Sequence, residues 1–114
     1  MRIDFEKWHG NGNDFVIVNG IESEIKINKS FIKKISNRNK GIGFDQLIYV
    51  CLPSKDNHDF FLRFFNTDGS EAEMCLNGAR CASRYIWNNS FAPLKKTSFL
   101  TRTKLLSCFP RKGG

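Results

Sequence analysis

A cysteine stands directly before a helix-forming segment in the sequence Cys75-Leu76-Asn77-Gly78-Ala79-Arg80. From Gly78 to about Trp87 apolar residues recur at helical spacing, and Asn77 is a residue type that favours the N-cap position. Four side chains of this segment are small: Ala79, Cys81, Ala82 and Ser83. Because small side chains let strands approach closely, we predict a helix that is enclosed by a sheet.

On this reading Cys75 lies two residues outside the helix N-terminus. The free backbone N–H groups and the helix dipole at such a place favour a thiolate, the reactive form of cysteine. The alternative is that Cys75 is a small buried apolar residue, which is the usual role of cysteine in a cytosolic domain. The segment around Cys75 does not decide between these interpretations, so the other motifs of the chain must.

Apolar runs separated by polar turns predict the strands. Residues 1–6 alternate charged and apolar side chains, and residues 15–18 form a buried strand. Residues 47–52 and 60–65 predict a hairpin around the turn at 53–57, and residues 98–103 and 105–109 predict two further strands. A short helix capped by Asn28 or Ser30 should present Phe31, Ile32 and Ile35 on one face and end near Asn39.

Three polar, glycine-bearing turns lie between the apolar runs. They are His-Gly-Asn-Gly-Asn-Asp-Phe at 9–15, Gly-Ile-Gly-Phe-Asp-Gln at 41–46 and Phe-Asn-Thr-Asp-Gly-Ser at 65–70. Together with residues 75–80, in this order, they resemble the N-terminal half of diaminopimelate epimerase, and the resemblance covers about residues 1–87. It implies an α+β fold, a strand-rich roll around a central helix, with residues 1–114 as the first of the family's two domains.

The resemblance also implies an activity. The family interconverts LL- and meso-diaminopimelate, for lysine and peptidoglycan synthesis, without pyridoxal phosphate or metal. One cysteine from each half stands on either side of the α-carbon, because inversion needs a base and an acid on opposite faces. By its match to the motif, Cys75 is the first of the two catalytic cysteines.

Five further positions match family residues that bind the substrate. The side-chain amides of Asn13, Gln46 and Asn66 can donate and accept hydrogen bonds with its amino and carboxylate groups. Asn77 and Gly78 should present backbone N–H groups to the α-carboxylate. The alternative is structural, because asparagine often stabilises turns and caps helices.

The remaining polar candidates receive structural roles. We expect His9 to stabilise its glycine-rich loop rather than to act as a base, and Arg80 to be structural because it lies inside the helix. His58, in a polar turn, should be solvated. Cys51 and Cys81 should be buried, and Cys108 stands in the wrong context to be the partner cysteine.

Two departures from the family pattern matter. Leu76 stands where the family has glycine, which predicts a disturbed backbone angle or a blocked ligand approach. In addition, the second half of the family fold, with its partner cysteine, histidine and glutamate, is missing from these 114 residues, and the Gly-Gly at 113–114 looks like a turn with no strand after it. These departures support one alternative, a truncated inactive remnant. The other alternative is a same-fold amino-acid racemase of the proline-racemase type.

Charge and composition limit the kinds of partner and the cellular location that we expect for the chain. The net charge of +7 is scattered over the chain and no nucleic-acid motif accompanies it, so we expect diaminopimelate as the ligand and no nucleic acid. No signal peptide or membrane-spanning run is visible, which predicts a cytoplasmic protein. The four cysteines should then be thiols, without a zinc site, and a full-length protein should be a homodimer.

Overall fold

The computed structural model describes residues 3–22 and 25–111. Within these residues seven strands form one sheet: β1 (Phe5–Gly10), β2 (Asn13–Gly20), β3 (Gln46–Cys51), β4 (Phe60–Asn66), β5 (Glu71–Ala72), β6 (Thr97–Leu100) and β7 (Leu105–Cys108). The same described residues form two helices, α1 (Lys29–Ser36) and α2 (Leu76–Asn88). The described helices include none long and apolar enough to cross a membrane.

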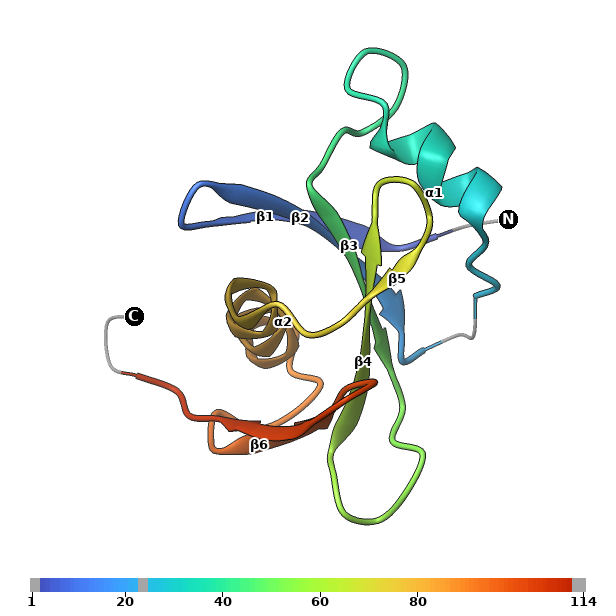
Figure 1. Ribbon diagram of the computed structural model, residues 1–114. Helices are drawn as coiled ribbons and strands as arrows, with labels where there is room; N and C mark the ends of the chain where they lie inside the picture. Colours follow the sequence, from blue (N-terminus) through green and yellow to red (C-terminus); the bar gives the residue numbers. More distant parts are fainter. Residues whose placement is uncertain (1–2, 23–24, 112–114) are drawn as a thin grey trace.

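The sheet is mixed and curls around α2. Its order is β1-β2-β3-β4-β6-β7, with β5 paired to β4. The pairs β2–β3 and β4–β6 are parallel, and the other pairs are antiparallel. Figure 1 shows α2 almost end-on, with β1 and β2 above it, β3 and β4 to its right and β6 below it. The predicted α+β fold with strands around a central helix is confirmed.

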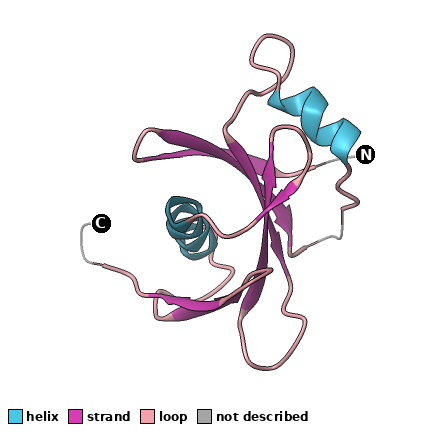
Figure 2. Ribbon diagram, in the orientation of Figure 1, coloured by secondary structure: helices cyan, strands magenta, loops and turns pink. Residues whose placement is uncertain are grey.

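Alternation along the central strands builds two hydrophobic cores, one on each face of the sheet. On β2, Phe15 and Ile17 face α2, whereas Val16 and Val18 face the opposite side. Helix α1 covers that opposite side through Ile32, which is fully buried, and lies outside the roll (Figure 2). Because both faces are covered, the middle of β2 is apolar without interruption.

The first hairpin differs from its prediction. Strand β1 extends through His9 to Gly10, so the turn contains only Asn11 and Gly12, with φ values of 50° and 83°. Two such residues in the left-handed region are typical of a tight hairpin turn, and Asn-Gly is a residue pair that favours this turn. Of the alternating strand predicted at residues 1–6, Met1 and Arg2 lie outside the described residues, as does the Gly-Gly at 113–114.

The other elements agree with their predictions apart from their ends. Strands β3 and β4 form the predicted antiparallel hairpin. The cap of α1 is Asn28, whose side chain accepts a hydrogen bond of 2.8 Å from the backbone N–H of Phe31. The helix ends at Ser36, earlier than expected, because Asn37 already has an extended backbone.

Candidate active site

Helix α2 begins earlier than its sequence predicted. Cys75 is the N-cap residue, and its carbonyl accepts the first helical hydrogen bond from the N–H of Ala79 at 2.9 Å. Asn77, the predicted cap, is the second helical residue, and its Oδ1 accepts instead a bond of 3.2 Å from Nδ2 of Asn11 in the β1–β2 turn. A long-range contact therefore replaces the local capping bond, and Cys75 lies at the helix start rather than two residues before it.

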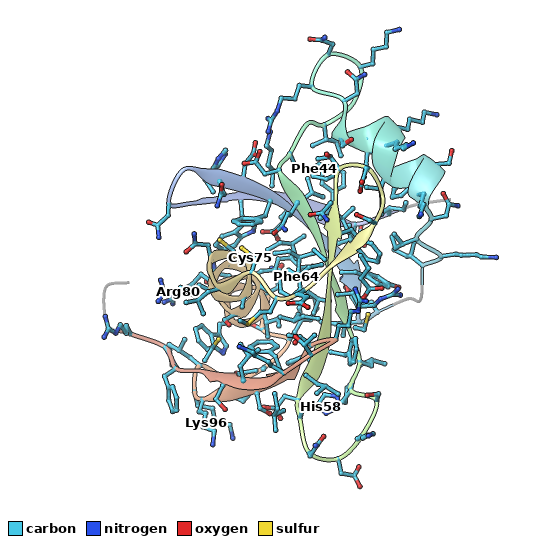
Figure 3. All side chains as sticks on the ribbon, viewed as in Figure 1. Phe44, His58, Phe64, Cys75, Arg80 and Lys96 are labelled. Carbon is cyan, nitrogen blue, oxygen red and sulfur yellow. The ribbon has the colours of Figure 1, made fainter. Side chains whose placement is uncertain are left out.

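The first turn of α2 provides the backbone donors that were expected near Cys75. The N–H groups of Leu76, Asn77 and Gly78 precede the first intrahelical bond, and such groups can bind an anion. Cys75 itself is half-buried and packs against the core that contains Phe64 (Figure 3). An anionic group at this helix end would therefore lie close to the sulfur.

Gly78 has a packing role in addition to the one predicted. A Cβ atom placed on Gly78 would lie 2.9 Å from Cδ1 of Ile48, 3.1 Å from Cε1 of Phe64 and 3.4 Å from Cε1 of Phe15. The absence of a side chain lets the first turn of α2 lie directly on the sheet. The depth of Cys75 relative to the strands thus depends on this glycine.

The three predicted amide side chains share one face and one end of the sheet. Asn13 alternates with Phe15 on β2, Gln46 with Ile48 on β3, and Asn66 with Phe64 on β4. Because Phe15, Ile48 and Phe64 all face α2, the three amides face α2 as well.

Register places these amides near one another. Gln46 pairs directly with Asn66 on β4 and with Phe15 on β2, two residues from Asn13. Side chains paired in this way on antiparallel neighbours have Cβ atoms about 5 Å apart. The structure therefore gathers the predicted residues at the end of the sheet where the hairpin tip contacts the start of α2.

Gln46 has an unsatisfied polar atom. Its Oε1 is buried and has no hydrogen-bond partner among the described residues. A buried acceptor without a partner is costly, and in native proteins it often marks a place where a ligand or water binds. Asn66, by contrast, already donates from Nδ2 to Oγ of Ser70 at 3.1 Å, while Asn13 is exposed.

Leu76 does not have the predicted backbone effect. Among the described non-glycine residues only Asn11 and Ser90 have positive φ values, so Leu76 adopts an ordinary helical backbone. Its side chain is 53% exposed, directly beside Cys75. What the leucine adds is therefore exposed apolar surface next to Cys75.

Two histidine predictions need correction. His9 lies in β1 rather than in a loop, and alternation along β1 places its exposed side chain on the face opposite Trp8, which packs in the α2 core. His58 is not solvated but only 5% exposed, because its Nε2 accepts a bond of 3.1 Å from the N–H of Ser54 and its Nδ1 lies 2.7 Å from Oδ1 of Asn57.

The remaining cysteines and Arg80 differ in their exposure. Cys81 is buried as predicted, and burial raises the pKa of its thiol. Cys51 is only half-buried, contrary to expectation, because it is the last residue of β3; Cys108 is half-buried on β7. Arg80 is exposed on α2 (Figure 3).

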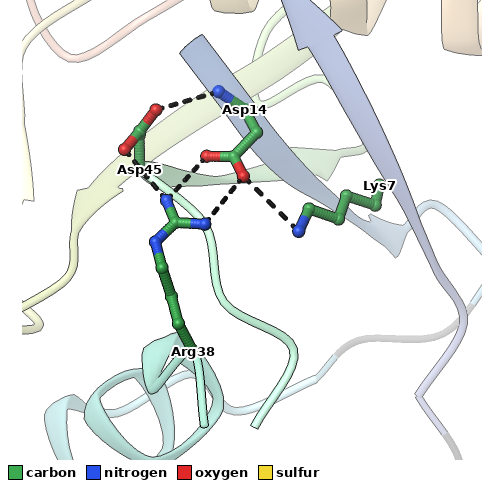
Figure 4. A network of polar contacts seen from close by, with 4 residues as sticks. All are labelled: Lys7, Asp14, Arg38 and Asp45. Atoms are coloured by element: carbon green, nitrogen blue, oxygen red, sulfur yellow. Dashed lines mark hydrogen bonds and ion pairs between the residues drawn. The ribbon is translucent and has the colours of Figure 1, made fainter.

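An ion-pair network that the sequence did not predict joins Lys7, Asp14, Arg38 and Asp45 (Figure 4). Arg38 donates to both carboxylate oxygens of Asp14 at 3.0 Å and to Oδ1 of Asp45 at 3.1 Å. Lys7 adds an ion pair of 3.4 Å with Asp14. Asp14 and Asp45 also bind each other, since Oδ2 of Asp45 accepts from the N–H of Asp14 at 2.9 Å. Arg38, expected to be one of several scattered surface charges, is thus shared by two carboxylates.

This network should make the free energy of unfolding depend on pH in the acidic range. The hydrogen bond from Arg38 holds the pKa of Asp14 well below its ordinary value. A carboxyl with a depressed pKa stabilises the fold above its unfolded pKa, about 3.9, and loses that contribution as pH falls toward the lower folded pKa. Asp14→Asn should therefore cost about 1.5 to 3 kcal/mol at pH 7 and progressively less below pH 4.

Urea unfolding between pH 2 and pH 7 measures this dependence. Asp56→Asn, which alters an exposed aspartate in the β3–β4 loop, is the control and should follow the unmodified chain at every pH. A constant difference between Asp14→Asn and the unmodified chain across this range would contradict the assignment.

A cavity of about 470 Å³ lies elsewhere, between β4 and the turn at 101–104, and Cys75 does not line it. The residues 3–22 and 25–111 contain no group of three or more histidine, cysteine, aspartate or glutamate side chains arranged to hold a metal ion. The candidate site is thus defined by the helix start and the three amides.

Comparisons with known proteins concern the family and the fold of the chain. The family model described as diaminopimelate epimerase matches residues 5–104. Methylitaconate-delta-isomerase has a similar structure, with a TM-score of 0.74 and 16% identity over 94% of this chain. A phenazine-biosynthesis PhzC/PhzF protein from Clostridium difficile strain 630 gives a TM-score of 0.63 and 22% identity over 90% of this chain, and a PhzF-family protein from Bacillus anthracis gives 0.60 and 20% over 92%.

These solved structures are longer than this chain. It spans 58% of the methylitaconate-delta-isomerase chain, 35% of the Clostridium difficile protein and 33% of the Bacillus anthracis protein. At identities of 22% or less the likeness concerns the fold alone.

Proposed function

Because the chain belongs to the diaminopimelate epimerase family, we propose that residues 1–114 form one wall of an amino-acid epimerase site, with Cys75 as the base on that side of the substrate α-carbon. The observation that carries the proposal is the convergence of Cys75, the first turn of α2 and three amides at one end of the sheet. The buried and unpartnered Oε1 of Gln46 adds a reason to expect a bound donor there. The proposed substrate is diaminopimelate.

The proposed chemistry is a proton transfer. The thiolate of Cys75 removes the α-proton, so that the C–H bond breaks and its electron pair remains on the α-carbon and the adjoining carboxylate. The backbone N–H groups of Asn77 and Gly78 stabilise the growing negative charge. A second group on the opposite face then donates a proton to the α-carbon, which inverts the centre and leaves Cys75 protonated.

The amide side chains fit the ends of such a substrate. Gln46 and Asn66, paired on neighbouring strands, can bind ammonium or carboxylate groups, and Asn13 extends the same row toward the hairpin tip. As in the family, the transfer would use thiols without a cofactor and serve lysine and peptidoglycan synthesis in the cytoplasm.

A second candidate is an isomerase of the same fold that acts on another acid, such as a proline-racemase-type enzyme. The observation that favours it is the exposed Leu76 beside Cys75, since an apolar side chain at the mouth of the site suits a less polar substrate than diaminopimelate.

Exchange of the α-proton in heavy water tests both candidates. The purified chain of residues 1–114 should exchange neither diaminopimelate nor proline faster than its Cys75→Ala variant does, because the opposite wall is not among these residues. Fused to the second half of a family member, the chain should exchange diaminopimelate. Cys75→Ala should then reduce the rate by roughly 100-fold or more, the usual contribution of a general base.

Cys51→Ala, which alters a half-buried thiol on β3, is the control and should leave the rate unchanged. Exchange of proline without exchange of diaminopimelate would favour the second candidate. Exchange of diaminopimelate by the fusion that persists in the Cys75→Ala variant would refute the assigned role of Cys75.

A further inference from the structure

Two of the proposed substrate amides each stand next to a member of the ion-pair network. Asn13 precedes Asp14, and Gln46 follows Asp45. We propose that Arg38, Asp14 and Asp45 form a clamp, the Arg38 clamp, that fixes the spacing of Asn13 and Gln46. These three are then positioning residues for the site, and this inference rests on the proposed function.

The clamp lies where the pairing of β2 with β3 begins. The first paired residues of these parallel strands are Phe15 and Gln46. One residue earlier, the N–H of Asp45 donates to the carbonyl of Asp14 at 3.0 Å, and the N–H of Asp14 donates to Oδ2 of Asp45 at 2.9 Å. The two residues are therefore joined by two hydrogen bonds, one of which uses the carboxylate of Asp45. These bonds extend the contact between β2 and β3 by one residue.

Arg38 acts from behind the site. Asp14 alternates with Asn13 on β2, so its carboxylate lies on the face of the sheet opposite α2. The guanidinium bridges this carboxylate and that of Asp45, as Figure 4 shows. Without the bridge, two negative charges would face each other across the strand ends, and mutual repulsion would separate them.

The loop that carries Arg38 is built closely around it. Gly43 has a φ of +74°, and a Cβ atom there would lie 2.8 Å from Cγ and 3.0 Å from Cα of Arg38. Only a residue without a side chain fits this approach. The position of the guanidinium is thus set by the backbone of the loop as well as by the ion pairs.

An ordinary surface ion pair is the alternative. The side chains of Arg38 and Asp45 are 55% and 46% exposed, and exposed pairs contribute little to stability. The side chain of Asp14, however, is only 12% exposed and receives two bonds from one guanidinium, a geometry that fixes orientation. The clamp is therefore expected to act on local geometry more than on global stability.

Hydrogen exchange and side-chain amide resonances in NMR spectra test the clamp without any ligand. In Arg38→Ala the backbone N–H groups of Asp14 and Asp45 should exchange roughly tenfold faster, the effect of losing one charge-assisted bond, while core N–H groups keep their rates. The side-chain amide resonances of Asn13 and Gln46 should shift. Lys33→Ala, which removes an exposed charge from α1, is the matched control and should change none of these signals.

A conservative variant separates positioning from charge. Arg38→Lys keeps the positive charge but cannot bind three carboxylate oxygens in one plane, so the Asn13 and Gln46 resonances should remain shifted although the charge is present. If Arg38→Ala does not fold, Asp45→Asn replaces it, because this variant keeps the acceptor for the N–H of Asp14 and should still shift the Gln46 resonance. Unshifted Asn13 and Gln46 resonances in the folded variants would overturn the clamp.

Titration with meso-diaminopimelate then connects the clamp to the site. Arg38→Ala should bind roughly tenfold more weakly than Lys33→Ala, well below the unfolding temperature of either. Equal affinity would overturn the clamp and leave the proposed function standing. Shifted resonances in a chain that does not bind diaminopimelate would leave the clamp standing and count against the proposed function.

Discussion

Phe64→Ala should lower the free energy of unfolding by about 3 to 5 kcal/mol, the usual cost of removing a buried phenylalanine. Phe64 is 1% exposed and lies in the core between the sheet and α2. Its ring edge would be 3.1 Å from a Cβ atom on Gly78, so the cavity would open directly under the first turn of α2.

A loss of this size is a large share of the 5 to 15 kcal/mol that stabilises an ordinary domain. Urea unfolding measures it. Phe109→Ala, which removes a ring that is 66% exposed, should change the unfolding free energy by less than about 0.5 kcal/mol. Equal losses for the two variants would mean that α2 does not pack on β4 as described.

Gly78→Val should destabilise the chain by about 1 to 3 kcal/mol although valine is a better helix former than glycine. The reason is overpacking, because a Cβ atom alone would contact Ile48, Phe64 and Phe15, and valine adds two methyl groups. The end of the Ile48 side chain can move, but the two rings leave it little room. We therefore expect the overlap to be relieved by a shift of the start of α2, and of Cys75 with it, away from the sheet.

Arg80→Val is the matched control for Gly78→Val because it places the same side chain on an exposed position of α2. It should cost only the difference in helix propensity, roughly 0.5 kcal/mol. Both values come from urea unfolding. A Gly78→Val chain as stable as Arg80→Val would show that the glycine is not needed for close packing.

The sequence predicted the architecture well because its strongest patterns are local. The apolar runs that became β2, β3 and β4 were visible, and the small residues of α2 correctly indicated a helix enclosed by strands. The predictions were wrong at positions where a tertiary contact overrides a local preference. Asn77 favours a cap but bonds to Asn11 instead. His58 lies in a polar stretch but is buried, where its Nε2 accepts a bond from the N–H of Ser54 and its Nδ1 contacts Oδ1 of Asn57.

The sequence predicted which residues form the candidate site, but it did not predict the ion pairs of Arg38 that lie beside them. Glycine-rich turns and family motifs indicate Cys75, Asn13, Gln46 and Asn66, and register then brings the three amides to one end of the sheet. Arg38 could not be assigned from the sequence, because nothing local relates it to Asp14, 24 residues away. That relation exists only once β2 and β3 pair.

Alkylation of Cys75 tests the central claim, that the start of α2 holds a reactive thiol in a substrate site. The chain is treated with limiting iodoacetamide at pH 7, and labelling of each cysteine is followed by peptide mass spectrometry, with the half-buried Cys51 and Cys108 as internal controls. We expect Cys75 to react fastest, since a helix N-terminus favours negative charge, and meso-diaminopimelate to slow Cys75 alone. Labelling of Cys75 no faster than that of Cys51 or Cys108, and unaffected by diaminopimelate, would contradict the account.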